Sequence, residues 1–223
     1  MLLVTATDLE MQALTAACVP ARLPEQRLIC GVGPAEAAFR LGLFLAAARA
    51  SGQLPDCVLN IGIAGAYLHP GLPAPAVLDC CLATSEVLGD LGKCQHGRLL
   101  PLQSGCHDFF PLDAALGSRI RSRLEEGGFP VETGPFVTVS CASGDRDRAD
   151  LLLARYPDAL CENMEGAALA LAAAHFGLPF AELRCVSNVV DEPERQHWCL
   201  QAACARCGEV AALLFEEKHT WIP

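Results

Sequence analysis

Two stretches decide how this chain folds: Cys161-Glu-Asn-Met-Glu-Gly-Ala-Ala168 and, further along, Glu182-Leu-Arg-Cys-Val-Ser-Asn188. The first places a carboxylate, Glu165, at the start of an alanine-rich helix. The second reads as a buried strand that ends in polar side chains. Ligand sites of α/β proteins form where the carboxyl ends of strands meet the neighbouring helices. The two stretches therefore predict an α/β protein that binds a small molecule where they converge.

Patterns typical of strands alternate with patterns typical of helices along the whole chain. Asp8 is the expected N-cap of the first helix, and Pro34 opens the second helix in a first turn, where proline is favoured. No repeat or linker interrupts the alternation, which predicts a single domain, residues 1–223, built as an α/β sandwich around a largely parallel or mixed sheet. Strands are expected at 2–6, 27–31, 57–63, 76–87, 136–140 and 179–186, helices at 8–18, 34–50, 113–126, 145–156, 164–176 and 196–218, and a polar, glycine-rich excursion at 89–105.

Charge and hydropathy exclude several classes of partner. The 223 residues carry a net charge of −10, whereas nucleic acids and anionic membranes require a basic surface. No run of apolar residues is long enough to span a bilayer. The N-terminus lacks the basic region of a signal peptide, and Asp8 and Glu10 interrupt its apolar residues. We expect a cytoplasmic protein with no nucleic acid or membrane partner.

The 13 cysteines are expected to be thiols that act as small buried hydrophobes, because nothing in the sequence indicates export. Three segments have the spacing of metal-site fragments: Cys94-Gln-His96, Cys106-His-Asp108 and Cys204-Ala-Arg-Cys207. The last has no second pair of ligands nearby in the sequence. We predict no metal and no cofactor, with a zinc site as the alternative that a zinc assay would decide.

Glycines follow two of the expected strands. Gly31-Val-Gly33 lies between a strand and a helix, but Glu36 occupies the position of the third glycine of a dinucleotide motif, so a plain turn is favoured. Asn60-Ile-Gly-Ile-Ala-Gly-Ala66 is more informative, since glycines at the end of a buried strand let a ligand approach the backbone closely. A crowded strand crossing is the alternative. The sequence has no Gly-x-Ser-x-Gly, Walker or His-Glu-x-x-His motif.

Together these segments resemble the purine nucleoside phosphorylase and nucleosidase superfamily. Within it the chain looks like the futalosine hydrolases of bacterial menaquinone biosynthesis, with the methylthioadenosine/adenosylhomocysteine nucleosidases as near relatives. The resemblance implies a three-layer sandwich with a central mixed β-sheet, a nucleoside substrate, and a homo-oligomer, most simply a dimer. It covers nearly the whole chain and rests on residues 6–10, 31–33, 60–65, 139–140, 163–165 and 184–188.

The resemblance also implies a role for individual residues. Glu165 would accept hydrogen bonds from the ribose 2′- and 3′-hydroxyls, and Met164 would pack beneath the sugar. Glu10 would be the general base that activates water, and Arg184 would help to hold that water. From the residues alone, the alternatives are a helix-terminus carboxylate for Glu165 and a core side chain for Met164. For Glu10 the alternative is a solvated helix residue, and for Arg184 it is a structural ion pair. The remaining residues that the resemblance places around the nucleoside are Asn163, Gly65, Ala64 and Ser140.

Two departures from the family pattern bear on the reaction. Where adenine-specific nucleosidases carry an Asp that assists the leaving base, this chain has Asn188, whose amide can donate to a keto oxygen or to N7 but cannot deliver a proton. This favours a 6-oxopurine such as hypoxanthine. Where phosphorylases carry phosphate-binding side chains, this chain has Asn60 and Ile63, which favours water as the nucleophile.

The resulting prediction is hydrolysis of futalosine to hypoxanthine and dehypoxanthine futalosine. A methylthioadenosine/adenosylhomocysteine nucleosidase, a purine nucleoside phosphorylase and a non-catalytic nucleoside-binding protein on the same fold are the alternatives. The presence of both Glu10 and Glu165 speaks against a pure binding protein, which would not need a water-activating carboxylate.

Overall fold

The structure is a computed structural model that describes residues 1–69, 74–102, 107–190, 194 and 197–216. Its strands are β1 (Leu2–Thr5), β2 (Gln26–Ile29), β3 (Val58–Ala66), β4 (Cys80–Leu88), β5 (Lys93–Gln95), β6 (Arg98–Leu100), β7 (Phe109–Pro111), β8 (Val131–Thr138), β9 (Cys161–Asn163) and β10 (Phe180–Val189). Its helices are α1 (Asp8–Ala17), α2 (Pro34–Ala50), α3 (Ala114–Glu126), α4 (Arg146–Leu153), α5 (Gly166–His175) and α6 (Leu200–Leu214), with a short 3₁₀ turn at Pro20–Arg22. None of the helices within these ranges is long and apolar enough to cross a membrane.

The central sheet is mixed, which confirms the predicted α/β class. Its strands follow the order β10-β4-β8-β9-β3-β1-β2, with β7 paired to β4. The pairs β1–β2, β1–β3, β3–β10, β4–β8 and β8–β9 are parallel, whereas β4–β10, β3–β9 and β4–β7 are antiparallel.

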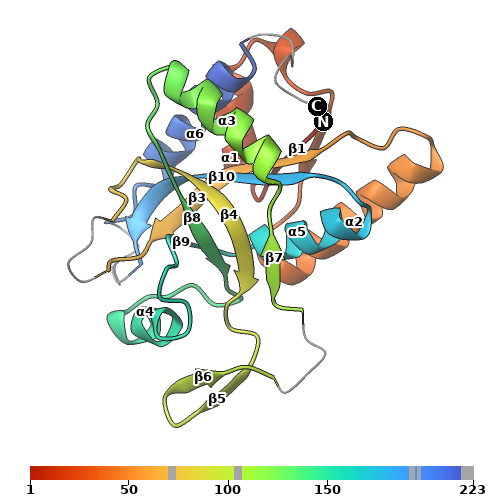
Figure 1. The fold of residues 1–223 in the computed structure, drawn as a ribbon. Coiled ribbons are helices and arrows are strands. Elements are labelled where there is room, and N and C mark those ends of the chain that lie inside the picture. Colours follow the sequence, from red (N-terminus) through yellow and green to blue (C-terminus); the bar gives the residue numbers. More distant parts are fainter. Residues whose placement is uncertain (70–73, 103–106, 191–193, 195–196, 217–223) are drawn as a thin grey trace.

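The sheet also closes on itself, which the predicted sandwich does not include. Because β10 pairs with β3 as well as with β4, the strands β3, β10, β4, β8 and β9 form a barrel-like ring. The short strand β9, which the sequence analysis did not predict, completes that ring between β8 and β3. Figure 1 shows β3, β4, β8 and β10 crossing near the centre of the molecule. Polar side chains of these strands can therefore meet in the interior, away from water.

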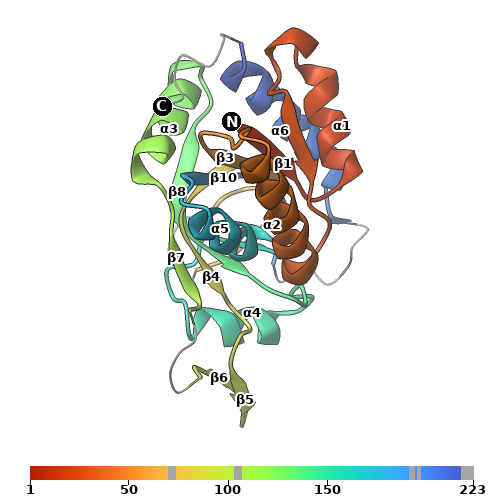
Figure 2. The same ribbon diagram turned by 90° about the vertical axis from the view of Figure 1, so that its right-hand side faces the viewer.

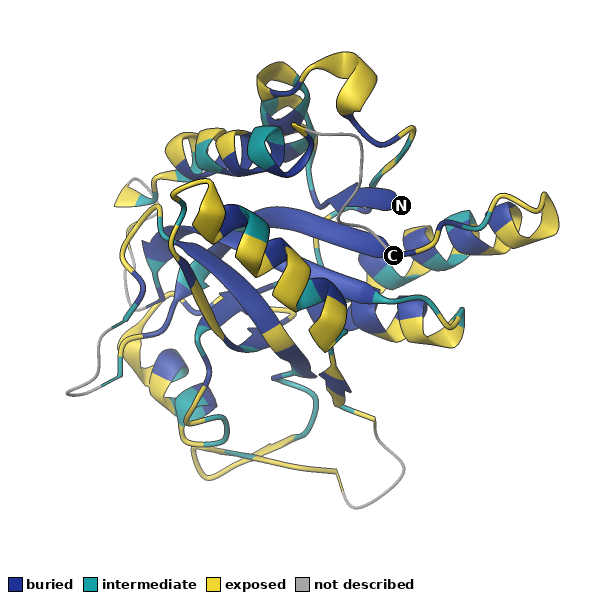
Figure 3. Ribbon diagram, turned by 45° about the horizontal axis from the view of Figure 1, so that its top comes forward, coloured by how far each residue is buried: buried dark blue, intermediate teal, exposed yellow. Residues whose placement is uncertain are grey.

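Helices pack on both sides of the sheet. The helices α1, α3 and α6 share a hydrophobic cluster with β1, β3 and β10, and α2 and α5 share another with β1 and the start of β3. Figure 2 shows α2 and α5 side by side, with α1 and α6 next to each other in a separate layer. Figure 3 shows that the strands between them are buried, whereas the helices expose their outer faces. The β5–β6 hairpin projects from the lower end of the molecule in Figure 1 and is part of the predicted polar excursion.

Several predicted boundaries are corrected by the structure. The N-cap of α1 is Thr7 rather than Asp8, because the Thr7 side chain accepts a hydrogen bond from the Glu10 amide. The predicted strand at 136–140 is the end of a longer one, β8, which begins at Val131 and ends at Thr138. The helix expected at 164–176 begins at Gly166, with Glu165 as its N-cap. Of the helix expected at 196–218, α6 covers Leu200–Leu214, and residues 196, 217 and 218 lie outside the described residues.

The cysteines of the described ranges are free thiols, and most of them are buried. Cys80 and Cys185 face each other across β4 and β10, with their sulfur atoms 3.8 Å apart. Cys207 donates to the Gly62 carbonyl at 3.1 Å. Cys106 lies outside the described residues. No group of three or more possible metal ligands occurs in the part of the chain that the structure describes.

Candidate active site

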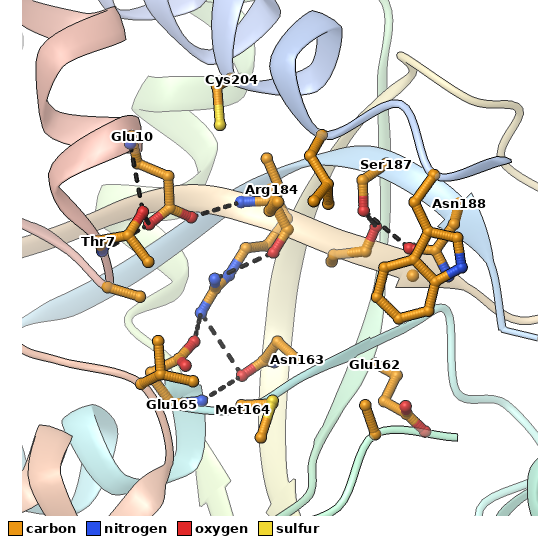
Figure 4. A pocket seen from close by; sticks show the side chains of 18 of the residues that line it. Thr7, Glu10, Glu162, Asn163, Met164, Glu165, Arg184, Ser187, Asn188 and Cys204 are labelled. Atoms are coloured by element: carbon orange, nitrogen blue, oxygen red, sulfur yellow. Dashed lines mark hydrogen bonds and ion pairs between the residues drawn. The ribbon is translucent and has the colours of Figure 1, made fainter. Parts of the chain in front are cut away.

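A cavity of about 280 Å³ opens at the carboxyl ends of β1, β3 and β10. Figure 4 shows Thr7, Glu10 and Glu165 on one side of it, Ser187 and Asn188 on the other, and Arg184 between them. The structure therefore brings together side chains that are far apart in the sequence. The predicted site residues that line this cavity are Glu10, Ala64, Gly65, Asn163, Met164, Glu165, Arg184 and Asn188.

Glu10 is buried at the start of α1, where a capping box fixes its carboxylate. Its Oε2 accepts hydrogen bonds from the backbone N and from Oγ1 of Thr7, both at 2.8 Å, and its own amide donates to Thr7 Oγ1 at 3.3 Å. Its Oε1 accepts from the amide of Ile63 on β3 at 3.0 Å. Such reciprocal capping satisfies amides at a helix start that would otherwise lack partners. Here it also holds a carboxylate in the cavity wall in one orientation.

Gly62 provides the space in which Glu10 and Arg184 approach each other. A Cβ atom at this position would lie 2.6 Å from Oε1 of Glu10 and 2.7 Å from Nη1 of Arg184. Neither side chain could keep its place beside a larger residue. The glycine predicted to allow close approach of a ligand therefore allows close approach of two side chains that line the cavity.

Arg184 is 1% exposed and is surrounded by acceptors. Its Nε donates to Oε1 of Glu182 at 2.7 Å, its Nη1 to the carbonyl of Ile63 at 3.1 Å, and its Nη2 to Oε2 of Glu165 at 3.2 Å. Burial would lower the pKa of Arg184, but the carboxylates of Glu182, Glu165 and Glu10 outweigh it and raise that pKa above its ordinary value. The guanidinium is a permanent cation with a fixed orientation.

Glu165 is the N-cap residue of α5 and is held on both of its carboxylate oxygens. Oε1 accepts from the amide of Gly33 at 3.2 Å, and Oε2 contacts Arg184. Its backbone amide donates to Oδ1 of Asn163 at 2.9 Å. Burial raises the pKa of Glu165 above its ordinary value, and Arg184 and the Gly33 amide oppose that rise. Because a carboxylate oxygen has more than one lone pair, both oxygens keep acceptor capacity toward the cavity.

A β-bulge sets the positions of Ser187 and Asn188. In the pairing of β10 with β3, Val186 is opposite Ala64 and Asn188 is opposite Gly65, so Ser187 is an extra residue. Its carbonyl accepts from the amide of Cys199 at 2.8 Å. Bulges of this kind re-aim side chains next to active sites. This one turns both polar side chains into the cavity.

The Asn188 amide has a defined orientation. Oδ1 accepts from Oγ of Ser187 at 2.8 Å, and Nδ2 donates to the carbonyl of Val189 at 3.0 Å. A Cβ at Gly65 would lie 3.3 Å from Asn188 Nδ2 and 3.0 Å from Cγ2 of Val190. Gly65 therefore leaves room for the Asn188 amide, whose second N–H has no acceptor among the residues that the structure describes.

Ser140 is the predicted site residue that the structure places outside the cavity. Its side chain is exposed, and its backbone amide donates to Oδ2 of Asp90 at 2.9 Å, because β8 ends at Thr138 and the chain turns away. Ser143 lines the cavity instead. Its amide and hydroxyl donate to Oε1 and Oε2 of Glu162, both at 2.7 Å, and Tyr67 also donates to Oε2 at 2.7 Å. Glu162 thus anchors this wall of the cavity.

Several lining residues were not identified from the sequence. Thr7 could have been, since Thr-x-x-Glu before an apolar run is the signature of a capping box. The others carry no local signal, because their proximity to the cavity depends on how distant segments pack. Burial raises the pKa of Cys204 to about 12, so this residue presents a neutral thiol to the cavity. The lining residues missed are Ala6, Thr7, Leu9, Val32, Ala142, Ser143, Glu162, Trp198, Leu200 and Cys204.

The cavity is suited to stabilising positive charge on a bound molecule. It combines carboxylates, one cation already engaged by them, and amide and hydroxyl groups on the opposite side. Preorganised charges of this kind are effective where water is excluded. The arrangement can hold a diol, orient a water molecule and donate hydrogen bonds to a heterocycle.

Comparisons with known proteins identify the family and the fold. Residues 28–216 match the model of the phosphorylase superfamily. The chain is 33% identical to futalosine hydrolase of Streptomyces coelicolor, in an alignment that covers 91% of this chain and 84% of the relative. It is 28% identical to 5′-methylthioadenosine/S-adenosylhomocysteine nucleosidase of Geobacillus kaustophilus, in an alignment that covers 73% of this chain and 66% of the relative. The crystal structure of the Neisseria meningitidis nucleosidase of the latter kind, in complex with methylthio-immucillin-A, superposes with a TM-score of 0.79 at 21% identity over 97% of this chain and 98% of that one. The chain therefore belongs to the phosphorylase superfamily and, within it, to the futalosine hydrolase family.

Proposed function

We propose that this protein hydrolyses the N-glycosidic bond of futalosine, releasing hypoxanthine and dehypoxanthine futalosine, as a step of menaquinone biosynthesis. One observation carries the proposal: Glu10, Glu165 and Arg184 line the same cavity as Asn188. Asn188 lies on the side of the cavity opposite Glu10 and Glu165. The carboxylates that suit a sugar therefore lie across the cavity from the amide that suits a purine base.

On the sugar side, Glu165 would accept hydrogen bonds from the two ribose hydroxyls. Glu10 would take a proton from the attacking water, with Arg184 beside it. As the base leaves, the sugar gains positive charge, which the buried carboxylates stabilise. Because Thr7 and the Ile63 amide already orient the Glu10 carboxylate, little reorganisation is needed when the water reacts.

On the base side, Asn188 would donate its second N–H to O6 or N7 of a 6-oxopurine. The base would leave as an anion stabilised by that hydrogen bond and would then take the proton that balances the one lost by the attacking water. The hydrogen bonds to Ser187 and Val189 fix which amide atom faces the cavity. An adenine base would present its own amino group, so the Asn188 amide would have to rotate and give up those bonds. This supports a hypoxanthine nucleoside as the substrate.

Hydrolysis is favoured over phosphorolysis by the charges around the cavity. Among the described lining residues Arg184 is the only cation, and its N–H groups are directed at Glu182, Ile63 and Glu165. Nδ2 of Asn60 donates to Oε1 of Glu182 at 3.4 Å, and the side chain of Ile63 is aliphatic, so neither side chain offers a donor to a phosphate in the cavity. A bound phosphate would compete with carboxylates for the one guanidinium, whereas water would not.

The second candidate is the methylthioadenosine/adenosylhomocysteine nucleosidase, which shares the fold. One experiment separates the possibilities: the protein is incubated with futalosine, methylthioadenosine and inosine, with and without phosphate, and free base is followed by chromatography. We expect hypoxanthine from futalosine without phosphate. Faster release of adenine from methylthioadenosine would favour the second candidate, release only with phosphate would indicate a phosphorylase, and binding without release would indicate a non-catalytic protein.

We further infer a homo-oligomer, most simply a dimer. Leu9 and Val32 line the cavity yet are 45% and 53% exposed, and Phe39 and Leu43 on the adjoining helix α2 are more exposed still. Apolar side chains at the rim of a site are the kind of surface that a second subunit covers. The three-layer nucleoside phosphorylase-like sandwich, the single domain and cytoplasmic residence stay predictions.

A further inference from the structure

Behind the cavity lie two carboxylates that no step of the proposed reaction uses. Glu86 on β4 and Glu182 on β10 have no exposed surface. A Cβ atom at Gly166 would collide with Oε1 of Glu86 and with Oε2 of Glu182, so these two oxygens converge on the same point at the start of α5. Closure of the sheet between β4 and β10 brings the two strands together.

Glu86 orients Asn163. Nδ2 of Asn163 donates to Oε1 of Glu86, which directs the other end of the amide, Oδ1, toward the N-terminus of α5. There Oδ1 accepts from the amides of Glu165 at 2.9 Å and Gly166 at 2.7 Å. If the amide rotated, its NH₂ group would face those N–H donors. Glu86 therefore determines which way Asn163 points, and Asn163 fixes the backbone of Glu165.

Glu182 orients Arg184. Its Oε1 accepts from Nε of Arg184 at 2.7 Å, and this bond sets the plane of the guanidinium that reaches Glu165 at 3.2 Å. Each of the two carboxylates thus holds one of the two side chains that contact Glu165. Both act on the same residue from behind the cavity.

Two negative charges cannot both be kept at this place. The two carboxylates are fully buried and converge on the same point, and like charges so placed strongly disfavour full ionisation. No N–H or O–H group of the described residues reaches Oε2 of Glu182, although it is buried. A proton between this atom and Oε1 of Glu86 would supply the missing hydrogen bond. Burial, followed by the charge of Glu182, raises the pKa of Glu86 well above its ordinary value, which is consistent with that proton.

The charged and titratable groups around the pair come from several elements. Arg184 lies on β10 beside Glu182, Glu165 caps α5, and Glu10 on α1 faces Arg184 from its other side. The thiol of Cys161 on β9 is close enough to Glu182 to be affected by its charge. Thr138 on β8 donates to Oε2 of Glu86 at 2.8 Å but does not titrate.

We propose that Glu86 and Glu182 form a positioning pair that shares one proton and fixes Asn163 and Arg184 around Glu165. The pair carries a single negative charge and makes no contact with substrate. This inference rests on the proposed ribose-binding role of Glu165 for its effect on catalysis, but the shared proton is a property of the folded chain alone.

The test compares Glu182→Gln with Glu182→Leu. Glutamine keeps an oxygen for Arg184 and places an N–H where the shared proton would be, and with ionised Glu86 it preserves the single negative charge. We expect Glu182→Gln to retain kcat/KM within about threefold of the original protein. Leucine keeps none of these bonds, and we expect kcat/KM to fall at least tenfold, with KM for the nucleoside raised. Equal damage by both substitutions would overturn the positioning role.

The second readout is the pH dependence of unfolding. If the folded pair retains a proton that unfolded carboxyl groups release, the folded state binds more protons, so stability falls as pH rises above the ordinary carboxyl range. Glu182→Gln removes the partner carboxylate and should weaken this fall. We expect the urea midpoint of the original protein to drop more between pH 6 and pH 9 than that of Glu182→Gln, with the other titrating groups common to both proteins.

Parallel pH dependences in the two proteins would overturn the shared proton. This measurement needs no substrate, so it tests the shared proton even if the protein does not cleave futalosine. Loss of the futalosine activity in the original protein would count against the proposed function only.

Discussion

Nη2 of Arg184 lies 3.2 Å from Oε2 of Glu165, and the two side chains are 1% and 5% exposed. This buried ion pair connects β10 to the start of α5, and Gly33 extends the connection to the loop before α2. Removing one member of a buried pair leaves the other charge without compensation. The pair is therefore a constraint on the geometry of the cavity as well as a part of its chemistry.

Substitution of Glu165 by Gln should damage binding and turnover together. The carboxylate would contact the diol in both ground and transition states, and its charge would support the developing cation. We expect kcat/KM to fall by about 10- to 100-fold, with KM raised and kcat lowered. The matched control is Glu132→Gln, an exposed carboxylate on β8, which should leave both constants unchanged. An unchanged KM in the Glu165 variant would contradict the diol contact.

Substitution of Glu10 by Gln should separate chemistry from binding. The amide keeps the size of the side chain and an acceptor for Thr7, but it cannot take a proton from water. General base catalysis typically contributes about 10²- to 10⁴-fold, and we expect kcat to fall by that order while KM changes little. Steady-state kinetics with futalosine measure both constants. Full turnover in this variant would remove Glu10 from the mechanism.

Thr7 links the stability of α1 to the orientation of Glu10. Thr7→Ala removes the cap and one of the hydrogen bonds to the Glu10 carboxylate, so we expect a loss of about 1 kcal/mol in the free energy of unfolding together with a lower kcat. Thr7→Ser keeps the hydroxyl and should behave like the original protein in urea unfolding and in turnover. Normal kcat in a destabilised Thr7→Ala variant would mean that the cap acts on the helix alone.

The exposed apolar residues at the cavity rim predict self-association. Light scattering should give a mass near twice the 23.6 kDa of one chain at micromolar concentration. Phe39→Glu and Leu43→Glu on α2 should shift the protein toward monomer. A monomer at every concentration tested would contradict the inferred dimer.

Much of the site could be predicted because the signals are local or belong to a family pattern. The carboxylate at the start of α5, the glycines of β3 and the polar end of β10 are each visible in a few consecutive residues. Their meeting at one cavity follows from the alternation of strands and helices. The capping box of Thr7 and Glu10 was equally visible but was missed, because Asp8 offered a plausible N-cap one residue later.

The rest depends on contacts that no local pattern encodes. Closure of the sheet requires β10 to pair with β3 on one side and with β4 on the other. The sequence of a buried strand does not indicate which strands pair with it. The bulge at Ser187 changes the direction in which the Asn188 side chain points, and no glycine in the sequence indicates that a bulge occurs there. Glu86 lies within residues 76–87, which were predicted only as a strand. Its proximity to Glu182 depends on the pairing of β4 with β10 and is visible only in the structure.

The most direct test of the account is the ratio of the initial rates on futalosine and methylthioadenosine, measured for the original protein and for Asn188→Asp. An unpaired polar group in a closed site costs about 1–3 kcal/mol, or roughly one to two decades in rate. The original protein should therefore prefer futalosine. In the variant, one carboxylate oxygen would face the Val189 carbonyl that Nδ2 now contacts at 3.0 Å, which favours a protonated acid able to assist adenine, and the ratio should shift toward methylthioadenosine. Faster cleavage of methylthioadenosine by the original protein, or an unchanged ratio in the variant, would contradict the assignment of Asn188 as the residue that selects the base.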